Sequence, residues 1–261
     1  LWSDKGGLTT EDHRRSIELR EVDYERMLRH RSLGDALTVE EIFARLGSDD
    51  PEAMDPAAQA LLTEAGVPVA ALAGSPKHAL RHAENGVDIV VAQGHEAGGH
   101  PGEIGSMVLW PEIVDALDGK APVLAAGGIG TGRQVAAALA LGAQGVWMGS
   151  AFLTSAEYDL GERLDSGRSV IQEAMLRATS ADTVRRRIYT GKPARLLKSR
   201  WTDAWDAPDA PEPLPMPLQN ILVSEAHQRM SESADPTAVA MPVGQIVGRM
   251  NEIRPVADII A

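Results

Sequence analysis

The distribution of apolar and polar residues along the chain changes near Ala65. The first sixty residues are highly charged and predict helices and loops, with a capped helix start at Thr10 and capping-box spacing in residues 38–47. Beyond Ala65, short and continuous apolar runs become frequent. Such runs are typical of strands buried on both faces of a parallel sheet.

Four apolar runs predict four strands, and helical stretches separate them. The strands are expected at Val67–Ala73, Val87–Ala92, Pro122–Ala126 and Gly145–Gly149, and the helices at 76–85, near 111–117 and at 131–141. Strand–helix alternation with short loops predicts a parallel α/β sheet or a barrel. An open doubly wound sheet is the competing architecture, and the pattern alone does not exclude it.

The chain beyond Ser155 is mostly helical and basic in character. Arg185–Arg187 could bind phosphate groups, although a solvated helix face is the favoured interpretation. A proline-rich stretch at 208–217 precedes a helix expected at 218–230. Trp201 and Trp205 lie four residues apart, which predicts a packing pair on one helix face.

Composition narrows the possible functions. The chain has 25 basic and 37 acidic residues and a net charge of −12, which argues against a nucleic-acid partner. It has no cysteine, so disulfides, thiolate metal sites and cysteine nucleophiles are excluded, and a cytoplasmic location is expected. No apolar run approaches the ~18 residues of a membrane span, so no membrane partner is expected.

A first glycine-rich loop, Gln93–Gly102, follows the second predicted strand. Active sites of parallel barrels assemble at this end of the strands. Gly98 and Gly99 permit positive φ angles and close approach of a ligand to the backbone. His100 is the candidate catalytic residue because an imidazole titrates near neutral pH. A mobile polar loop with incidental histidines is the plainer alternative.

The same loop contains His95 and Glu96. His95 fits a ligand-facing role and a packing role equally well, and Glu96 could orient or tune either imidazole. A zinc site is a further alternative, because His-X-Glu is present. The spacing of a helical zinc motif and any cysteine partner are missing, so no metal is expected.

A second glycine-rich segment, with Gly127 and Gly128, follows the third strand, and Gly149 and Ser150 follow the fourth. Backbone N–H groups in such loops and at helix N-termini bind phosphate, commonly after the last two strands of a barrel. The spacing of a dinucleotide-binding loop is not met, and no nucleotide-triphosphatase loop occurs. In the tail, Gln245 and its flanking glycines could contact a ligand or form a structural turn.

Residues 92–102 and 122–150 closely resemble the motifs of the nitronate monooxygenase family, formerly called 2-nitropropane dioxygenases. The resemblance continues through 179–187, 191–194 and 242–251, and so covers the chain from about Ala65 onward. It implies an FMN enzyme on a TIM barrel. It also implies oxidation of a nitronate by molecular oxygen to a carbonyl compound and nitrite.

The resemblance also implies roles for individual residues. His100 matches the histidine that takes the α-proton of a neutral nitroalkane or lies against the substrate. The resemblance implies cofactor binding near the flavin ring for Gln93, Gly94, Gly98 and Gly99. It implies binding of the FMN phosphate for Gly127, Gly128, Gly149 and Ser150. In the tail, it implies a cofactor contact for Gln245.

Two departures from the family pattern stand out. Some relatives place a lysine beside the flavin on the strand aligned with Val67–Ala73, where this chain has only apolar residues. The early barrel strands have no counterpart in residues 1–60. The expected fold is therefore a (β/α)8 TIM-barrel type without its N-terminal strands, with a mostly helical C-terminal extension. The expected segments are 1–60, a barrel portion at 61–190, and an extension at 191–261 that packs on the barrel.

Two alternatives to nitronate oxidation remain open. One is a flavin reductase that passes electrons from NADH or NADPH to a quinone or an enoyl thioester. The other is a non-catalytic barrel fragment. The expected partners of the enzyme are a small-molecule substrate and O2, and a homo-oligomer is an open possibility.

Overall fold

The computed structural model describes residues 66–159, 161–216 and 218–261. The helices expected within the first sixty residues lie outside these ranges. Residues 70–261 form one compact unit, and all contacts discussed below are within it.

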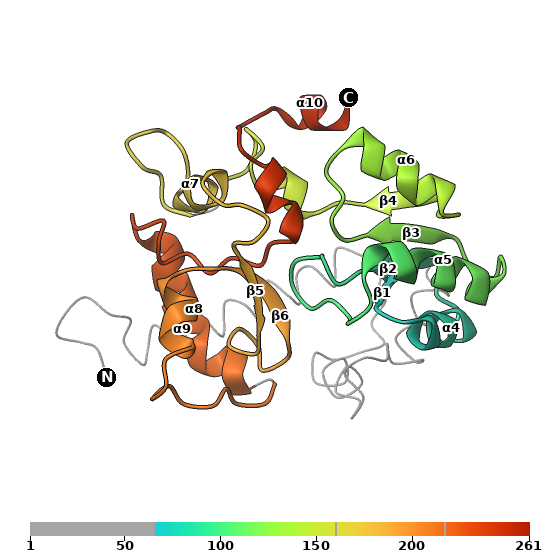
Figure 1. Ribbon diagram of the computed structural model, residues 1–261, viewed down its shortest axis with the longest axis horizontal. Helices are drawn as coiled ribbons and strands as arrows, with labels where there is room; N and C mark the ends of the chain where they lie inside the picture. The colour runs from blue at the N-terminus through green and yellow to red at the C-terminus, as the bar shows by residue number, and fades with distance from the viewer. Residues whose placement is uncertain (1–65, 160, 217) are drawn as a thin grey trace. The chain divides into compact units, whose positions relative to one another are not determined.

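The first half of this unit alternates strands and helices in the predicted order (Figure 1). It comprises β1 Ala70–Ala73, α4 Pro76–Glu84, β2 Ile89–Gln93, α5 Ser106–Leu117, β3 Val123–Ala126, α6 Gly132–Ala140 and β4 Gly145–Trp147. The strands form one parallel sheet in the order β1-β2-β3-β4. A sheet whose spatial order follows the chain order without reversal is typical of a barrel segment, whereas a doubly wound sheet reverses direction at a switch point.

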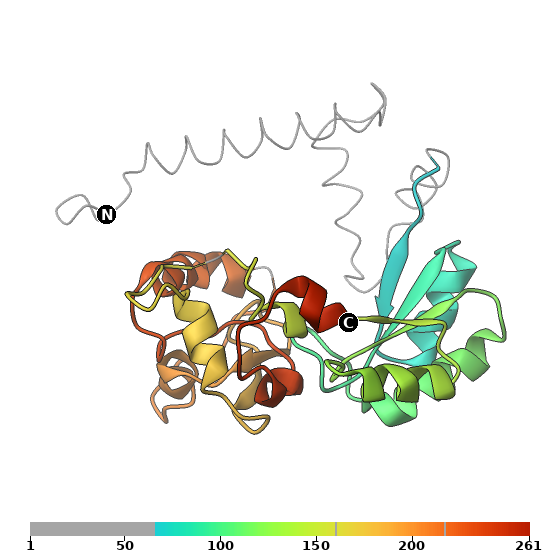
Figure 2. The ribbon, with the colours of Figure 1, turned by 90° about the horizontal axis from the view of Figure 1, so that it is seen from above.

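The three helices cover one face of the sheet, as Figure 2 shows. Ala73, Val90 and Val123 point from the strands into a buried core, where they meet Leu109 and Ile113 of α5. These side chains are almost fully buried. Small strand residues let the helices approach closely, so a core poor in aromatic residues still packs well.

The opposite face of the sheet is exposed at its edge strands, whereas Val91 of the central strand β2, which lies on that face beside Leu72, is buried. Leu72 of β1 is 53% exposed and Trp147 of β4 is 51% exposed. Along β1, exposed and buried residues alternate, so the prediction of a strand buried on both faces is wrong here. The reason is that helices cover only one face, and β1 and β4 are the two edges of this sheet.

Helix α5 begins at Ser106, well before the expected start near Pro111, which lies inside the helix. The backbone N–H of Ser106 donates to the carboxylate of Glu96 at 2.9 Å. A carboxylate at this position satisfies a free N–H group of the first turn, so the helix is capped upstream of the proline.

The second half of the unit mixes helices with an antiparallel hairpin. Its elements are η2 Ser150–Phe152, α7 Val170–Leu176, β5 Thr183–Arg186, β6 Ala194–Leu197, α8 Arg200–Trp205, α9 Leu218–Glu232, η3 Gln245–Arg249 and α10 Val256–Ile260. The helix expected at 218–230 is confirmed. Trp201 and Trp205 form the expected pair on α8, with ring centroids 5.8 Å apart.

The favoured interpretation of Arg185–Arg187 as a helix face is wrong. Arg185 and Arg186 belong to β5, which pairs with β6. The adjacent strand β6 is buried along its whole length and includes a buried arginine, Arg195. Because Arg185, Arg186 and Arg195 interrupt the apolar pattern, a search for apolar runs does not predict this hairpin.

Among the residues that the structure describes, no helix is both long enough and apolar enough to cross a membrane. Nor do three or more His, Asp or Glu side chains in these ranges gather in a way that could hold a metal ion.

Candidate active site

A cavity of about 150 Å³ lies at the carboxyl ends of β2, β3 and β4. It brings together the loops that follow these three strands, and the tail of the chain contributes Gly244 and Ile246. The predicted cofactor-binding residues that line it are Gln93, Gly98, Gly127, Gly128, Gly149 and Ser150. The other predicted site residues, His100, Gly94, Gly99 and Gln245, are not part of its lining.

Glycine is required at the first turn after β3. Gly127 has φ +101° and Gly128 has φ +72°, a backbone conformation that other residues rarely adopt. A Cβ atom at Gly127 would also lie 3.0 Å from the carbonyl oxygen of Gly94. This turn therefore presents bare backbone to the cavity.

Gly149 differs from these two glycines. Its φ of −119° is accessible to any residue, and a Cβ atom there would meet no atom within 4 Å. Neither local conformation nor packing within the described residues requires glycine at this position. A ligand that approaches the backbone closely would require it.

The turn after β3 is held by Gln134 of α6. Its side-chain oxygen accepts the N–H of Gly130 and the hydroxyl of Thr131, each at 3.0 Å, and its amide donates to the carbonyl oxygen of Gly128. The helix that follows the loop thus holds the loop geometry through these three hydrogen bonds. Preorganised N–H groups lose less entropy when they bind an anion.

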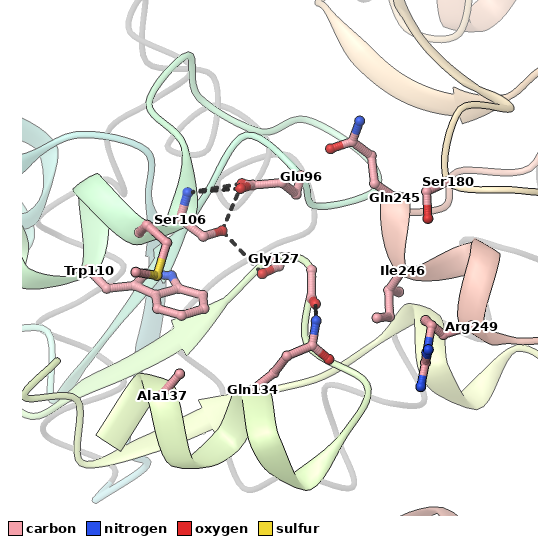
Figure 3. A pocket seen from close by; sticks show the side chains of 12 residues that line it. Glu96, Ser106, Trp110, Gly127, Gln134, Ala137, Ser180, Gln245, Ile246 and Arg249 are labelled. Carbon is pink, nitrogen blue, oxygen red and sulfur yellow. Dashed lines mark hydrogen bonds between the residues drawn. The ribbon is translucent and has the colours of Figure 1, made fainter. Parts of the chain in front are cut away.

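Trp110 and Ser106 of α5 join the first loop to the second. The indole N–H of Trp110 lies 3.1 Å from the carbonyl oxygens of Ala92 and of Ala126, at the ends of β2 and β3. The Ser106 hydroxyl lies 2.8 Å from a carboxylate oxygen of Glu96 and 3.1 Å from the carbonyl oxygen of Gly127 (Figure 3). Glu96 thus caps α5, and the expectation that it orients an imidazole is not met.

A second cavity of about 360 Å³ adjoins the turn at Gly127 and Gly128 from the side of α5 and α6, and Gln245 lies here (Figure 3). The backbone N–H of Gln245 donates to the carbonyl oxygen of Glu96 at 2.9 Å. The next N–H upstream, that of Gly244, donates to the Ser150 hydroxyl at 2.9 Å. The tail therefore closes against both predicted loops.

His100 contacts the turn of the β5–β6 hairpin. Its Nε2 lies 2.6 Å from Oγ1 of Thr190, a buried residue, and this hydrogen bond is partly buried although His100 as a whole residue is exposed. Partial burial, with a smaller contribution from the charge of Lys192, lowers the pKa of His100 below its usual value. This shift favours the neutral form of the imidazole.

The hairpin also holds the backbone of the first loop. Gly99 and Arg195 form a β-bridge in which the Arg195 N–H donates to the Gly99 carbonyl at 2.6 Å and the Gly99 N–H donates back at 3.1 Å. The Arg195 guanidinium donates two hydrogen bonds, at 3.1 and 2.9 Å, to the carbonyl oxygen of His95. It also donates to Oγ1 of Thr183 at 3.1 Å.

His95 plays a structural part in this loop. Its Nδ1 lies 3.0 Å from the carbonyl oxygen of Gly102, which can only accept, so Nδ1 carries the proton. The ring therefore closes the loop on itself. Of the two roles left open for His95, the geometry supports the structural one.

Sequence reasoning missed the residues that support the site rather than line it. Ser106, Trp110 and Gln134 are the polar or amphipathic positions of the helices that follow each glycine loop, and that position was an available signal. Thr190 and Arg195 had no such signal, because they reach the loop through a hairpin about ninety to a hundred residues away.

A family model, that of nitronate monooxygenase, matches residues 39–261. Rv1533 of Mycobacterium tuberculosis, which is named as a monooxygenase, is 53% identical over 198 residues. A Bacillus subtilis protein named as a nitronate monooxygenase is 36% identical over 200 residues. The two matches cover 74% and 73% of this chain and 51% and 55% of those proteins. The chain therefore spans about half the length of these relatives.

Two solved structures are similar to this one. A nitroalkane oxidase from Streptomyces ansochromogenes matches with a TM-score of 0.67 and 31% identity, over 78% of this chain and 59% of that one. FabK from Thermotoga maritima matches with a TM-score of 0.63 and 33% identity, over 76% of this chain and 60% of that one.

Proposed function

Because the chain belongs to the nitronate monooxygenase family, we propose that it binds FMN at the carboxyl ends of β2, β3 and β4 and oxidises alkyl nitronates. The products are a carbonyl compound and nitrite, and molecular oxygen is the oxidant. Flavin supplies the redox chemistry when it is bound, and the protein positions the substrate and excludes side reactions.

The observation that carries the proposal is the cavity lined by glycine backbone. Gly127 and Gly128 expose backbone groups on one side, and Gly149 leaves open space on the other. Parallel barrels bind phosphate at this place, in the loops after their last two strands. The residues present therefore fit the phosphate of FMN. Close approach of this phosphate to the backbone would explain the glycine at position 149, which packing does not require.

Gln93 and Gly98 line the same cavity from the first loop, and we assign them to the ring system of the flavin. Gly98 must be glycine for the loop itself, because a Cβ atom there would lie 2.6 Å from the backbone of Val243. Gly94 is required in the same way, since its Cβ atom would collide with Ser106. Gly99 contributes through its bridge to β6.

We assign His100 to the substrate rather than to the cofactor. It is an exposed residue on the same loop as Gln93 and Gly98 but outside the cavity lining, and its lowered pKa favours the neutral imidazole. A neutral imidazole can accept a proton from a weak carbon acid or donate a hydrogen bond to a nitro oxygen.

We further place β1–β4 as consecutive strands of a (β/α)8 barrel. The sequential strand order and the helices on one face support this placement, as does the similarity to the solved nitroalkane oxidase. In that placement the face with Leu72 and Trp147, opposite the helices, is the interior of the barrel.

The first experiment is the visible absorption spectrum of the purified chain with and without added FMN. Binding is expected to give bands near ~450 and ~370 nm, and the pigment released on denaturation is expected to be FMN. A colourless protein that FMN does not reconstitute would contradict the proposal and would favour the non-catalytic fragment.

A nitrite assay with an alkyl nitronate and oxygen then tests the reaction. Nitrite is expected to form in proportion to oxygen consumed, without any nicotinamide. Oxidation of NADH or NADPH in the steady state, with no nitrite from nitronates, would instead identify the reductase alternative.

A further inference from the structure

Thr190 is the only protein group in the described ranges that hydrogen-bonds the His100 ring. The two side chains meet at 2.6 Å between Nε2 and Oγ1, and His100 Nδ1 has no protein partner there. Thr190 is 8% exposed, and its oxygen also accepts the N–H of Lys192 at 3.4 Å. The direction of the His100–Thr190 hydrogen bond decides which nitrogen of the neutral imidazole carries the proton.

Two arrangements are possible, and they differ in how well Thr190 is satisfied. If Nε2 donated, the hydroxyl oxygen would accept twice, and the buried hydroxyl proton would have no acceptor in the described part of the chain. If the hydroxyl donates to Nε2, its oxygen still accepts from Lys192 and every group of Thr190 is used. Buried polar groups are generally satisfied, so the second arrangement is favoured.

We propose that Thr190 is a positioning residue that donates its hydroxyl proton to Nε2 of His100 and thereby fixes the neutral imidazole as its Nδ1–H tautomer. His100 then presents an N–H donor, and no free lone pair, at Nδ1, the nitrogen without a protein partner in the described ranges. An imidazolium at His100 would require the Thr190 hydroxyl to reverse its hydrogen bond, so this arrangement belongs to the neutral ring.

The consequence for specificity rests on the proposed function. A nitronate is an anion whose oxygens accept hydrogen bonds, so an Nδ1–H donor stabilises it. A neutral nitroalkane must first lose its α-proton, and an imidazole without a free lone pair cannot accept that proton. The geometry therefore selects the anionic nitronate over the neutral nitroalkane.

The tautomer can be read without any enzymatic assay. Long-range proton–nitrogen correlation spectra of the 15N-histidine-labelled full chain, near neutral pH, separate protonated from unprotonated ring nitrogens. His95 is an internal reference for Nδ1–H, because its Nδ1 faces the Gly102 carbonyl. His82 is the reference for Nε2–H, because its Nε2 faces the Leu72 carbonyl. The His100→Gln variant assigns the His100 signals.

The expected result is a His100 pattern like that of His95. A pattern like that of His82 would overturn the proposal. Thr190→Ser retains the hydroxyl and is expected to keep the Nδ1–H tautomer, whereas Thr190→Val removes it and is expected to shift the population toward Nε2–H by about fivefold. If Thr190→Val does not fold, the wild-type and Thr190→Ser spectra still decide between the two tautomers.

The specificity is tested separately, on the holoenzyme. The ratio of kcat/KM for a nitronate to kcat/KM for its neutral nitroalkane is expected to fall by about fivefold in Thr190→Val and to stay constant in Thr190→Ser. A ratio unchanged in Thr190→Val would overturn the specificity argument. If no variant turns over nitronates at all, the proposed function fails, while the spectra still stand as a test of the Thr190–His100 geometry.

Discussion

The carboxylate of Glu96 accepts both the backbone N–H of Ser106, at 2.9 Å, and the hydroxyl of Ser106, at 2.8 Å. Because the same hydroxyl lies 3.1 Å from the carbonyl oxygen of Gly127, one buried serine connects the loop after β2 to the turn after β3. The connection is electrostatic as well as geometric, since a carboxylate complements the N-terminus of α5.

Glu96→Ala is expected to lower the free energy of unfolding by about 1–2 kcal/mol, because the helix loses its cap and Ser106 loses an acceptor. Glu96→Gln keeps one acceptor oxygen and is expected to lose about half as much. Urea denaturation followed by circular dichroism measures both. Equal losses in the two variants would show that the charge, and not the hydrogen bonds, is responsible.

Gly149→Ala is expected to leave the fold intact and to weaken FMN binding by about tenfold or more. The backbone conformation tolerates alanine, and the added methyl group meets no atom of the protein within 4 Å. The methyl group would therefore clash only with a ligand that lies close to the backbone. Fluorescence titration with FMN measures the affinity.

Gly132→Ala is the matched control for that variant. Gly132 is the first residue of α6, and a Cβ atom there likewise meets nothing within 4 Å, but Gly132 does not line the cavity. FMN affinity is expected to stay unchanged, and stability is expected to rise by up to about 1 kcal/mol. Similar affinities for the two variants would contradict the phosphate site.

Arg195→Met is expected to lower the free energy of unfolding by about 2–3 kcal/mol, because the partly buried carbonyl oxygen of His95 loses both of its charged donors. Arg200→Met, which removes a surface ion pair with Asp235, is expected to cost less than about 1 kcal/mol. Denaturant titrations of the two variants give the comparison. A loss at Arg195 no larger than that at Arg200 would mean that the hairpin is not tied to the His95 loop by this side chain.

His227 makes stability depend on pH. Burial lowers its pKa from 6.5 to about 4, and its ring stacks on Tyr189 with centroids 4.6 Å apart. The unfolded chain therefore binds a proton between about pH 6.5 and 4 that the folded chain does not. The contribution of the neutral His227 to the free energy of unfolding is therefore fully present above pH 6.5. It is lost as the pH falls, and at pH 5 the free energy of unfolding is lower by about 2 kcal/mol.

His227→Phe keeps an aromatic ring at this position and removes the titrating group. Between pH 7 and pH 5, the free energy of unfolding of this variant is expected to fall by about 2 kcal/mol less than that of the wild type. Parallel urea titrations at the two values measure the difference. An identical pH dependence in both proteins would show that His227 does not carry the effect.

The sheet could be predicted from sequence because each of its strands is a local apolar run that ends at a glycine. Most residues that line the cavity could be predicted for the same reason, since they lie at the end of a strand or in the loop that follows it, whereas Gly244 and Ile246 come from the tail. Position along the strand settles where such a residue lies, because the carboxyl ends of parallel strands meet at one edge.

The hairpin could not be predicted in this way. In β6 the four residues Ala194–Leu197 are all buried, yet one of them is an arginine, so the run does not read as apolar. The partner of His100 was equally hidden, because nothing local to Thr190 indicates that it contacts a loop ninety residues upstream. Side chains that act across such separations become visible only when the tertiary structure brings them together.

The link between Arg195 and the carbonyl of His95 spans one hundred residues of chain. The strands β1 to β4 pair only with strands that are their neighbours in sequence, so each pairing closes a comparatively short segment of chain. The loop that carries His100, in contrast, is held by the distant β5–β6 hairpin. Contacts of long sequence separation form late because the entropy of closing the chain opposes them. On a ribosome, the sheet can therefore assemble while the loop that carries His100 still lacks its support, and the site is completed only after the hairpin has emerged.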